Sequence, residues 1–127
     1  MTPNDLDDAA TAFLTDRHIA TLTTLRGDGF PHVVAIAFTW DADAGLVRII
    51  TREGSAKVRN VRRSARGAVA QVDGPRWLSL EGPAEVTDDP VRVAEAVRRY
   101  GERYQPPREA TDRVAIEITV ERVLGNW

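Results

Sequence analysis

The chain has 127 residues, 43% of them hydrophobic, and a formal net charge of −2. This length is typical of a single domain, spanning residues 1–127. The slightly acidic balance argues against nucleic acid as a partner, because domains that bind nucleic acid usually carry a basic surface. No apolar run reaches the roughly 18 residues of a membrane span. The absence of cysteine excludes disulfides and thiolate metal sites.

The N-terminal segment is acidic and lacks the charged and apolar regions of a signal peptide, so we expect a cytoplasmic protein. Apolar residues at helical spacing predict an amphipathic helix from Asn4 to about Asp16. A hairpin follows, in which a Gly-Asp-Gly turn joins the strands His18–Arg26 and Phe30–Trp40. The apolar residues of the second strand occupy both faces, which predicts a central strand covered on two sides.

The rest of the chain alternates strands and short helices. Periodicity, caps and turns predict a third strand at Leu46–Thr51, a helix from Ser55 to about Arg63, a fourth strand at Gly67–Val72, a fifth from Arg76 to about Thr87, a helix opened by Asp88 or Asp89 with Pro90 and stopped by Pro106-Pro107, and a last strand at Val114–Val123. Gly82-Pro83 indicates a bulge or bend in the fifth strand, because proline cannot donate to a neighbouring strand. Six mainly antiparallel strands with short peripheral helices predict an α+β barrel.

The single lysine, Lys57, lies where the third strand turns into a helix. If Ser55 caps this helix, Lys57 falls in its first turn, where a cation is poorly placed beside the positive end of the helix dipole. A bound anion would remove this misfit. The backbone N–H groups of residues 55–57, the hydroxyls of Thr51 and Ser55, and Lys57 could then clamp one phosphate or carboxylate. The alternative is an exposed lysine beside an ordinary cap.

Other side chains offer little chemistry. His18 and His32 do not have the spacing of metal ligands on one element, so we expect no metal. Glutamates recur at period-two spacing in two strands and are expected on solvated faces: Glu81, Glu85, Glu117 and Glu121. Trp77, at the start of a strand, either covers the core or stacks on a planar ligand or a subunit interface. With an anion clamp and no catalytic side chain, the sequence favours a protein that positions a cofactor.

Five segments together resemble a known family: Ala12–Leu25, Pro31–Val34, Ser55–Asn60, Gln71–Gly82 and Glu121–Gly125. They resemble the FMN-binding split-barrel proteins of the pyridoxamine phosphate oxidase class over nearly the whole chain. Within that class, they are most similar to the actinobacterial branch that uses the deazaflavin coenzyme F-420. The Gln71–Gly82 run looks close to the deazaflavin-dependent biliverdin reductases.

The resemblance implies a split-barrel homodimer with the cofactor at the subunit interface. It implies these cofactor-binding residues: His32, Val33, Val34, Thr51, Ser55, Ala56, Lys57, Asn60 and Trp77. The phosphate would lie at the strand–helix junction, the ring against the second strand, and the tryptophan would approach from the partner subunit. The implied activity is hydride transfer from reduced F-420 to a small planar substrate, with biliverdin as the best match.

One position departs from the family pattern. Many relatives carry an arginine two residues before the lysine, whereas this chain has Ser55. Arg52 and Arg59 are candidates to supply the missing charge. Two alternatives stay open: an FMN-dependent enzyme of the pyridoxamine phosphate oxidase type, and a binding protein that carries a flavin, deazaflavin or tetrapyrrole without turnover.

Overall fold

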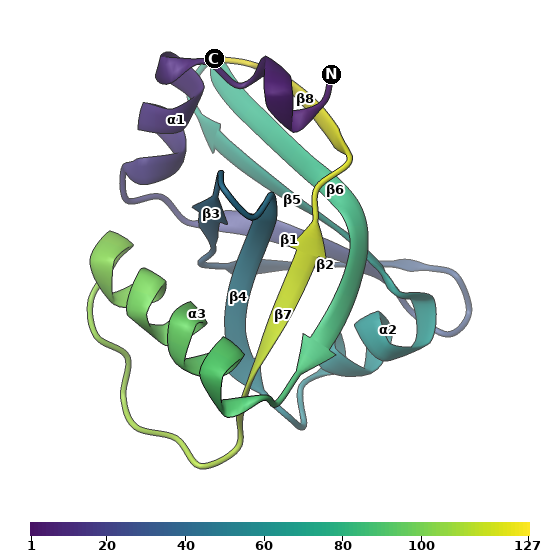
Figure 1. The fold of residues 1–127 in the computed structure, drawn as a ribbon. Helices are drawn as coiled ribbons and strands as arrows, with labels where there is room; N and C mark the ends of the chain where they lie inside the picture. Colours follow the sequence, from purple (N-terminus) through teal and green to yellow (C-terminus); the bar gives the residue numbers. More distant parts are fainter.

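The computed structural model describes all 127 residues, and the two termini lie at the same end of the molecule (Figure 1). The helices are η1 (Pro3–Asp5, a 3-10 turn), α1 (Asp8–Thr15), α2 (Ala56–Ser64) and α3 (Pro90–Arg103). The strands are β1 (Ala20–Leu25), β2 (Pro31–Ile36), β3 (Thr39–Asp41), β4 (Leu46–Arg52), β5 (Arg66–Asp73), β6 (Arg76–Thr87), β7 (Arg113–Thr119) and β8 (Arg122–Asn126). None of the helices has the length and apolar character needed to span a bilayer.

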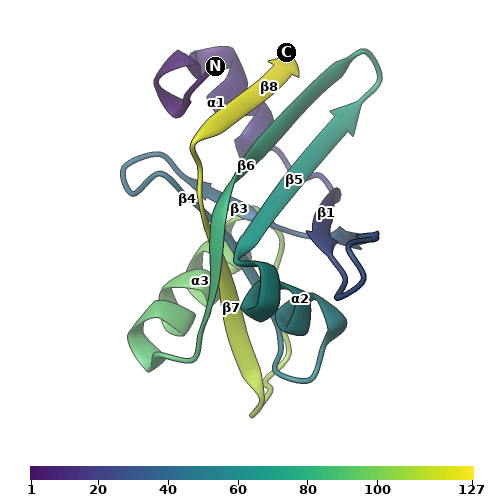
Figure 2. The same ribbon diagram turned by 90° about the vertical axis from the view of Figure 1, so that its right-hand side faces the viewer.

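The sheet is antiparallel throughout, in the order β2-β1-β5-β6-β7-β4-β3, with β8 paired to β6. Only residues 37 and 38 separate β2 from β3, so the two ends of this path are close in space. The sheet therefore curls into the predicted α+β split barrel. Figure 2 shows β5 and β6 rising as a hairpin away from α2 and the lower end of β7.

The predicted bend in the long strand is confirmed. β6 pairs with β5 up to Pro83 and with β7 from Ala84 onward, and the strand is strongly curved in Figure 1. A Cβ atom on Gly82 would lie 1.9 Å from the carbonyl oxygen of Thr119. Glycine is therefore required where the backbones of β6 and the end of β7 meet.

Two predicted strands are each divided in the structure, giving eight strands instead of six. The second strand breaks at Phe38, whose backbone groups bond to side chains of α3 and the residue after it. The Phe38 carbonyl accepts from Arg103 at 2.7 Å, and its N–H donates to the Tyr104 hydroxyl at 3.3 Å. The last strand breaks where Val120 donates to the Gly45 carbonyl and Glu121 to that of Glu81. At both breaks the backbone groups bond outside the pairing of neighbouring strands, so the ladder of inter-strand hydrogen bonds is interrupted there.

The prediction of a central second strand covered on two sides is wrong. β2 lies at one end of the strand order, and its Val33 side chain is 57% exposed. Only one face of β2 is turned toward the barrel, where Ile36 is buried. The apolar residues on the second face of β2 are therefore exposed in the single chain, not covered by another layer.

The prediction of a solvated Glu117 is also wrong. Glu117 is 6% exposed and forms an ion pair with Arg92 of α3, with Arg48 of β4 3.9 Å away. Arg48 in turn pairs with the buried Asp41 at 2.7 Å. Burial is the largest single influence on the pKa of Asp41 and would raise it, but the hydrogen bonds from Arg48 and the Ala44 N–H and the charges of Arg99 and Arg48 together lower the pKa. α3 thus packs on the sheet partly through a layer of ion pairs.

Candidate functional site

The junction of β4 and α2 is built by local hydrogen bonds, as the sequence predicts. Ser55 caps α2 by accepting from the Val58 N–H at 3.4 Å, and its own N–H donates to the Arg52 carbonyl at 3.1 Å. The Thr51 hydroxyl donates to the Ser55 hydroxyl at 3.3 Å. The N–H groups of Ala56 and Lys57, the first two helical residues, have no backbone acceptor. Two hydroxyls and two free donors therefore meet at this helix terminus.

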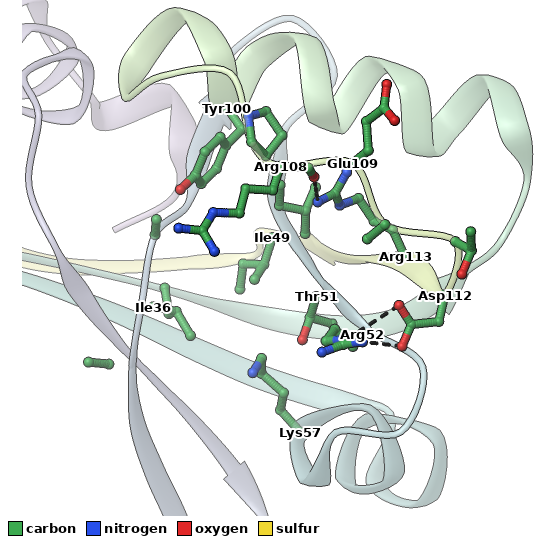
Figure 3. A pocket seen from close by; sticks show the side chains of 16 residues that line it. Ile36, Ile49, Thr51, Arg52, Lys57, Tyr100, Arg108, Glu109, Asp112 and Arg113 are labelled. Atoms are coloured by element: carbon green, nitrogen blue, oxygen red, sulfur yellow. Dashed lines mark hydrogen bonds and ion pairs between the residues drawn. The ribbon is translucent and has the colours of Figure 1, made fainter.

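Lys57 adds an unpaired cation to this junction. The side chain is half-buried and has no carboxylate within ion-pair distance. Burial lowers the pKa of Lys57, because a partly dehydrated ammonium loses stabilisation by water. In Figure 3 the side chain extends past Thr51 toward Ile36, away from the body of α2. An anion bound here would compensate both the dehydrated ammonium and the positive helix end.

Lys57 and Thr51 line a cleft of about 1130 Å³. The lining residues are 35–37 at the end of β2 and just after it, 49–52 of β4, Lys57 of α2, Tyr100 of α3, and 107–113, which form the loop before β7 and its first residue. Ile36, Ile49 and Ile50 supply the apolar floor of the cleft. The cleft thus combines an apolar floor with a cationic edge, which is the usual composition of a site for a small organic ligand.

The wall opposite Lys57 is the loop between α3 and β7 (Figure 3). Arg52 pairs with Asp112 of this loop at 3.0 Å, and the Glu53 N–H donates to the Asp112 carbonyl at 2.9 Å. The loop is therefore attached to the end of β4, close to the helix terminus. Sequence reasoning missed this wall, because a polar segment after two prolines has no local signal that distinguishes it from any solvated loop.

The comparisons with known proteins agree with this architecture. The sequence matches the model of the pyridoxamine 5'-phosphate oxidase family over residues 6–126. The chain belongs to the pyridoxamine 5'-phosphate oxidase family. One similar protein is the biliverdin reductase of Mycobacterium tuberculosis that depends on reduced F-420. It is 51% identical over 125 residues, which cover 98% of this chain and 91% of the relative.

Three solved structures have the same fold as this chain. A conserved hypothetical protein from Mycobacterium tuberculosis superimposes with a TM-score of 0.79 at 26% identity, covering 94% of this chain and 83% of that one. An F-420 reductase superimposes with a TM-score of 0.74 at 27% identity, covering 89% of this chain and 94% of that one. The haem storage protein of Vibrio cholerae, at 15% identity and a TM-score of 0.76, covers 94% of this chain and 93% of its own and shares the fold.

The structure brings four of the predicted site residues together at the cleft. Thr51 and Lys57 line the cleft, and Ser55 and Ala56 form the helix terminus beside it. Arg52 also lines the cleft but pairs with Asp112. The junction therefore has the donors that a phosphate requires, namely hydroxyls, free N–H groups and an ammonium.

Other predicted residues lie apart from the cleft lining. The β2 residues His32, Val33 and Val34 immediately precede the lining residues 35–37. The buried Nδ1 of His32 has no hydrogen-bond partner. Arg59, the other candidate for extra charge, donates to the Gly54 carbonyl at 2.8 Å.

Asn60 and Trp77 have different surroundings. The Asn60 side chain is buried, donating to the Thr24 hydroxyl at 3.1 Å and accepting from Arg63 at 2.8 Å. In this chain its amide therefore joins α2 to β1. Trp77 is 40% exposed near the turn of the β5–β6 hairpin and is not among the residues that line the cleft.

Proposed function

We propose that this protein is an oxidoreductase that uses reduced F-420 to transfer a hydride to a planar conjugated substrate, namely biliverdin. The observation that carries the proposal is the unpaired Lys57 ammonium at the edge of an open, apolar-floored cleft. The 51% identity to an F-420-dependent biliverdin reductase supports the choice of cofactor and substrate. When bound, reduced F-420 supplies a hydride, and a proton from solvent or from the substrate completes the reduction to bilirubin.

The residues of this chain have binding and orienting roles in the proposal. Lys57, the Thr51 and Ser55 hydroxyls, and the N–H groups of Ala56 and Lys57 hold the cofactor phosphate. The β2 segment from His32 through Val34 and the adjoining residues 35–37 would hold the ring system, and the isoleucine floor would shield it from water. No side chain is required as a nucleophile, which fits a site where the cofactor carries the chemistry.

We further propose a homodimer in which the exposed face of β2 is covered. Apolar side chains remain exposed on this face and on the neighbouring hairpins, including Phe30 at 64%, Val33 at 57% and Val72 at 64%. Exposed apolar clusters on a strand at the sheet edge mark contact surfaces. In such a dimer Trp77 reaches the cofactor of the partner subunit.

Trp77→Ala is expected to weaken dimerisation or cofactor binding, as measured by sedimentation and by titration. A dimeric variant with unchanged affinity refutes this placement.

Cofactor choice and turnover test the function directly. The purified protein is titrated with F-420 and with FMN, and reduced F-420 is then mixed with biliverdin while biliverdin absorbance is followed. We expect preferential binding of F-420 and loss of biliverdin absorbance. Preferential binding of FMN would support the oxidase-type alternative of the family. Binding of F-420 and biliverdin without any absorbance loss would support a carrier instead of an enzyme.

A further inference from the structure

We infer that Arg108, in the loop between α3 and β7, binds a carboxylate of the ligand on the cleft wall opposite Lys57. This inference deepens the proposed function and rests on it for the identity of the ligands. Lys57 is assigned to the cofactor phosphate, and Arg108 provides a second, separate anion receptor in the same cleft. The carboxylate could belong to a side chain of the tetrapyrrole or to the glutamate tail of F-420.

The guanidinium of Arg108 has no partner within the chain. It forms no ion pair and donates no hydrogen bond, whereas two neighbouring arginines of the cleft are both engaged. Arg52 pairs with Asp112 at 3.0 Å, and Arg113 donates to the Arg108 carbonyl at 2.5 Å. Arg108 is exposed to solvent, and Figure 3 shows its side chain extending beneath Tyr100 on the side of the loop that faces the cleft. Its five donors are therefore available to a ligand.

The loop backbone is restrained on both sides of Arg108. Pro106 and Pro107 restrict the backbone before it. After it, Arg113 holds the Arg108 carbonyl, and the Asp112 carbonyl accepts from the Glu53 N–H at 2.9 Å. Less conformational entropy is lost when a ligand binds a side chain on a restrained loop. Arginine also suits this role, because its planar fork matches a carboxylate with two parallel hydrogen bonds.

The charge and size of the cleft leave room for a second anion. Four basic and two acidic side chains line it, and Asp112 is already neutralised by Arg52. A volume of about 1130 Å³ exceeds the roughly 300–1,000 Å³ that single-ligand pockets occupy. A cofactor and part of a second molecule can therefore share the cleft, with anionic groups at opposite walls.

The test compares ligands with and without the carboxylate. Wild type, Arg108→Gln and Arg108→Lys are titrated with biliverdin, biliverdin dimethyl ester, F-420, and F-420 whose tail carboxylates have been esterified. Arg17→Gln is the matched control, because it removes an exposed arginine outside the cleft. Dissociation constants come from absorbance and fluorescence titration and need no turnover.

We expect Arg108→Gln to weaken the carboxylate-bearing ligand about 10- to 100-fold and its esterified counterpart less than about twofold. Arg108→Lys should recover part of the affinity. A selective loss for biliverdin identifies the substrate as the source of the carboxylate, and a selective loss for unesterified F-420 identifies the cofactor. Equal losses for both members of a pair, or no loss for either ligand, overturn the inference. Failure of the proposed function is seen separately, as absence of biliverdin reduction by the wild type.

Discussion

The Thr51 hydroxyl, near the end of β4, donates to the Ser55 hydroxyl, which caps α2, at an oxygen–oxygen distance of 3.3 Å. This contact joins the strand to the helix at the proposed phosphate site. The same serine oxygen accepts from the Val58 N–H. One side chain therefore stabilises the helix and orients a hydroxyl beside Lys57.

Ser55→Ala is expected to lower both stability and cofactor affinity. Loss of the cap costs about 1 kcal/mol of unfolding free energy, and loss of the hydroxyl removes a donor from the phosphate. Urea unfolding and F-420 titration measure the two effects. Ser55→Thr should retain most of both properties. Ser64→Ala, at the other end of α2 where the hydroxyl donates to the Asn60 carbonyl, should leave cofactor affinity unchanged.

Lys57→Ala is expected to weaken F-420 binding by about 1.5–3 kcal/mol, the usual contribution of a hydrogen bond to a charged group. Added salt should weaken binding to the wild type more than to the variant, because the contact is electrostatic and partly exposed. Arg62→Ala is the control, since it removes a cation of the same helix that pairs with Glu53 outside the cleft. Equal affinity of Lys57→Ala and wild type would remove Lys57 from the site.

Cofactor affinity should fall at alkaline pH. Burial lowers the pKa of Lys57 in the free protein below the ordinary lysine value of 10.5, whereas a bound phosphate favours the charged form and raises it again. Above the lowered pKa, binding must therefore take up a proton, and the dissociation constant rises with pH. Fluorescence titration between neutral pH and pH ~11 measures this slope, with the upper limit set near the lysine range. Lys57→Arg, charged throughout, should show no such rise.

Glu117→Gln is expected to destabilise the fold by about 2–3 kcal/mol, because the half-exposed Arg92 and the mostly buried Arg48 lose a buried charged acceptor. The loss is smaller than for an isolated buried pair, since Asp41 still neutralises Arg48. Glu85→Gln is the control, because Glu85 pairs with the same Arg92 but its side chain is 65% exposed. Its effect should stay below about 1 kcal/mol in urea unfolding. Similar losses of unfolding free energy in the two variants would contradict the claim that burial makes Glu117 more important for stability than Glu85.

Gly82→Ala is expected to destabilise the protein by about 3 kcal/mol or more, because an added methyl group collides with backbone that cannot move freely. The Cβ would lie 1.9 Å from the Thr119 carbonyl oxygen. Gly54→Ala is the matched control, since nothing lies within 4 Å of the added atom there. Thermal unfolding of the two variants distinguishes this collision from a general effect of replacing glycine.

Sequence by itself determined the features that depend on neighbours a few residues apart. The Ser55 cap, the position of Lys57 in the first turn of α2 and the bend at Gly82-Pro83 all follow from short-range geometry. The family resemblance extended these local inferences to the split barrel and to the cofactor class. Both inferences depend on sequence motifs and on no tertiary contact.

Tertiary structure alone decided the features that depend on segments far apart in the chain. The edge position of β2 follows from the strand order, and the burial of Glu117 follows from the packing of α3. Arg108 reaches the cleft of Lys57 because the loop before β7 is attached to the end of β4 by Asp112. Local propensity carries no information on such contacts, since their stability arises only when the barrel closes.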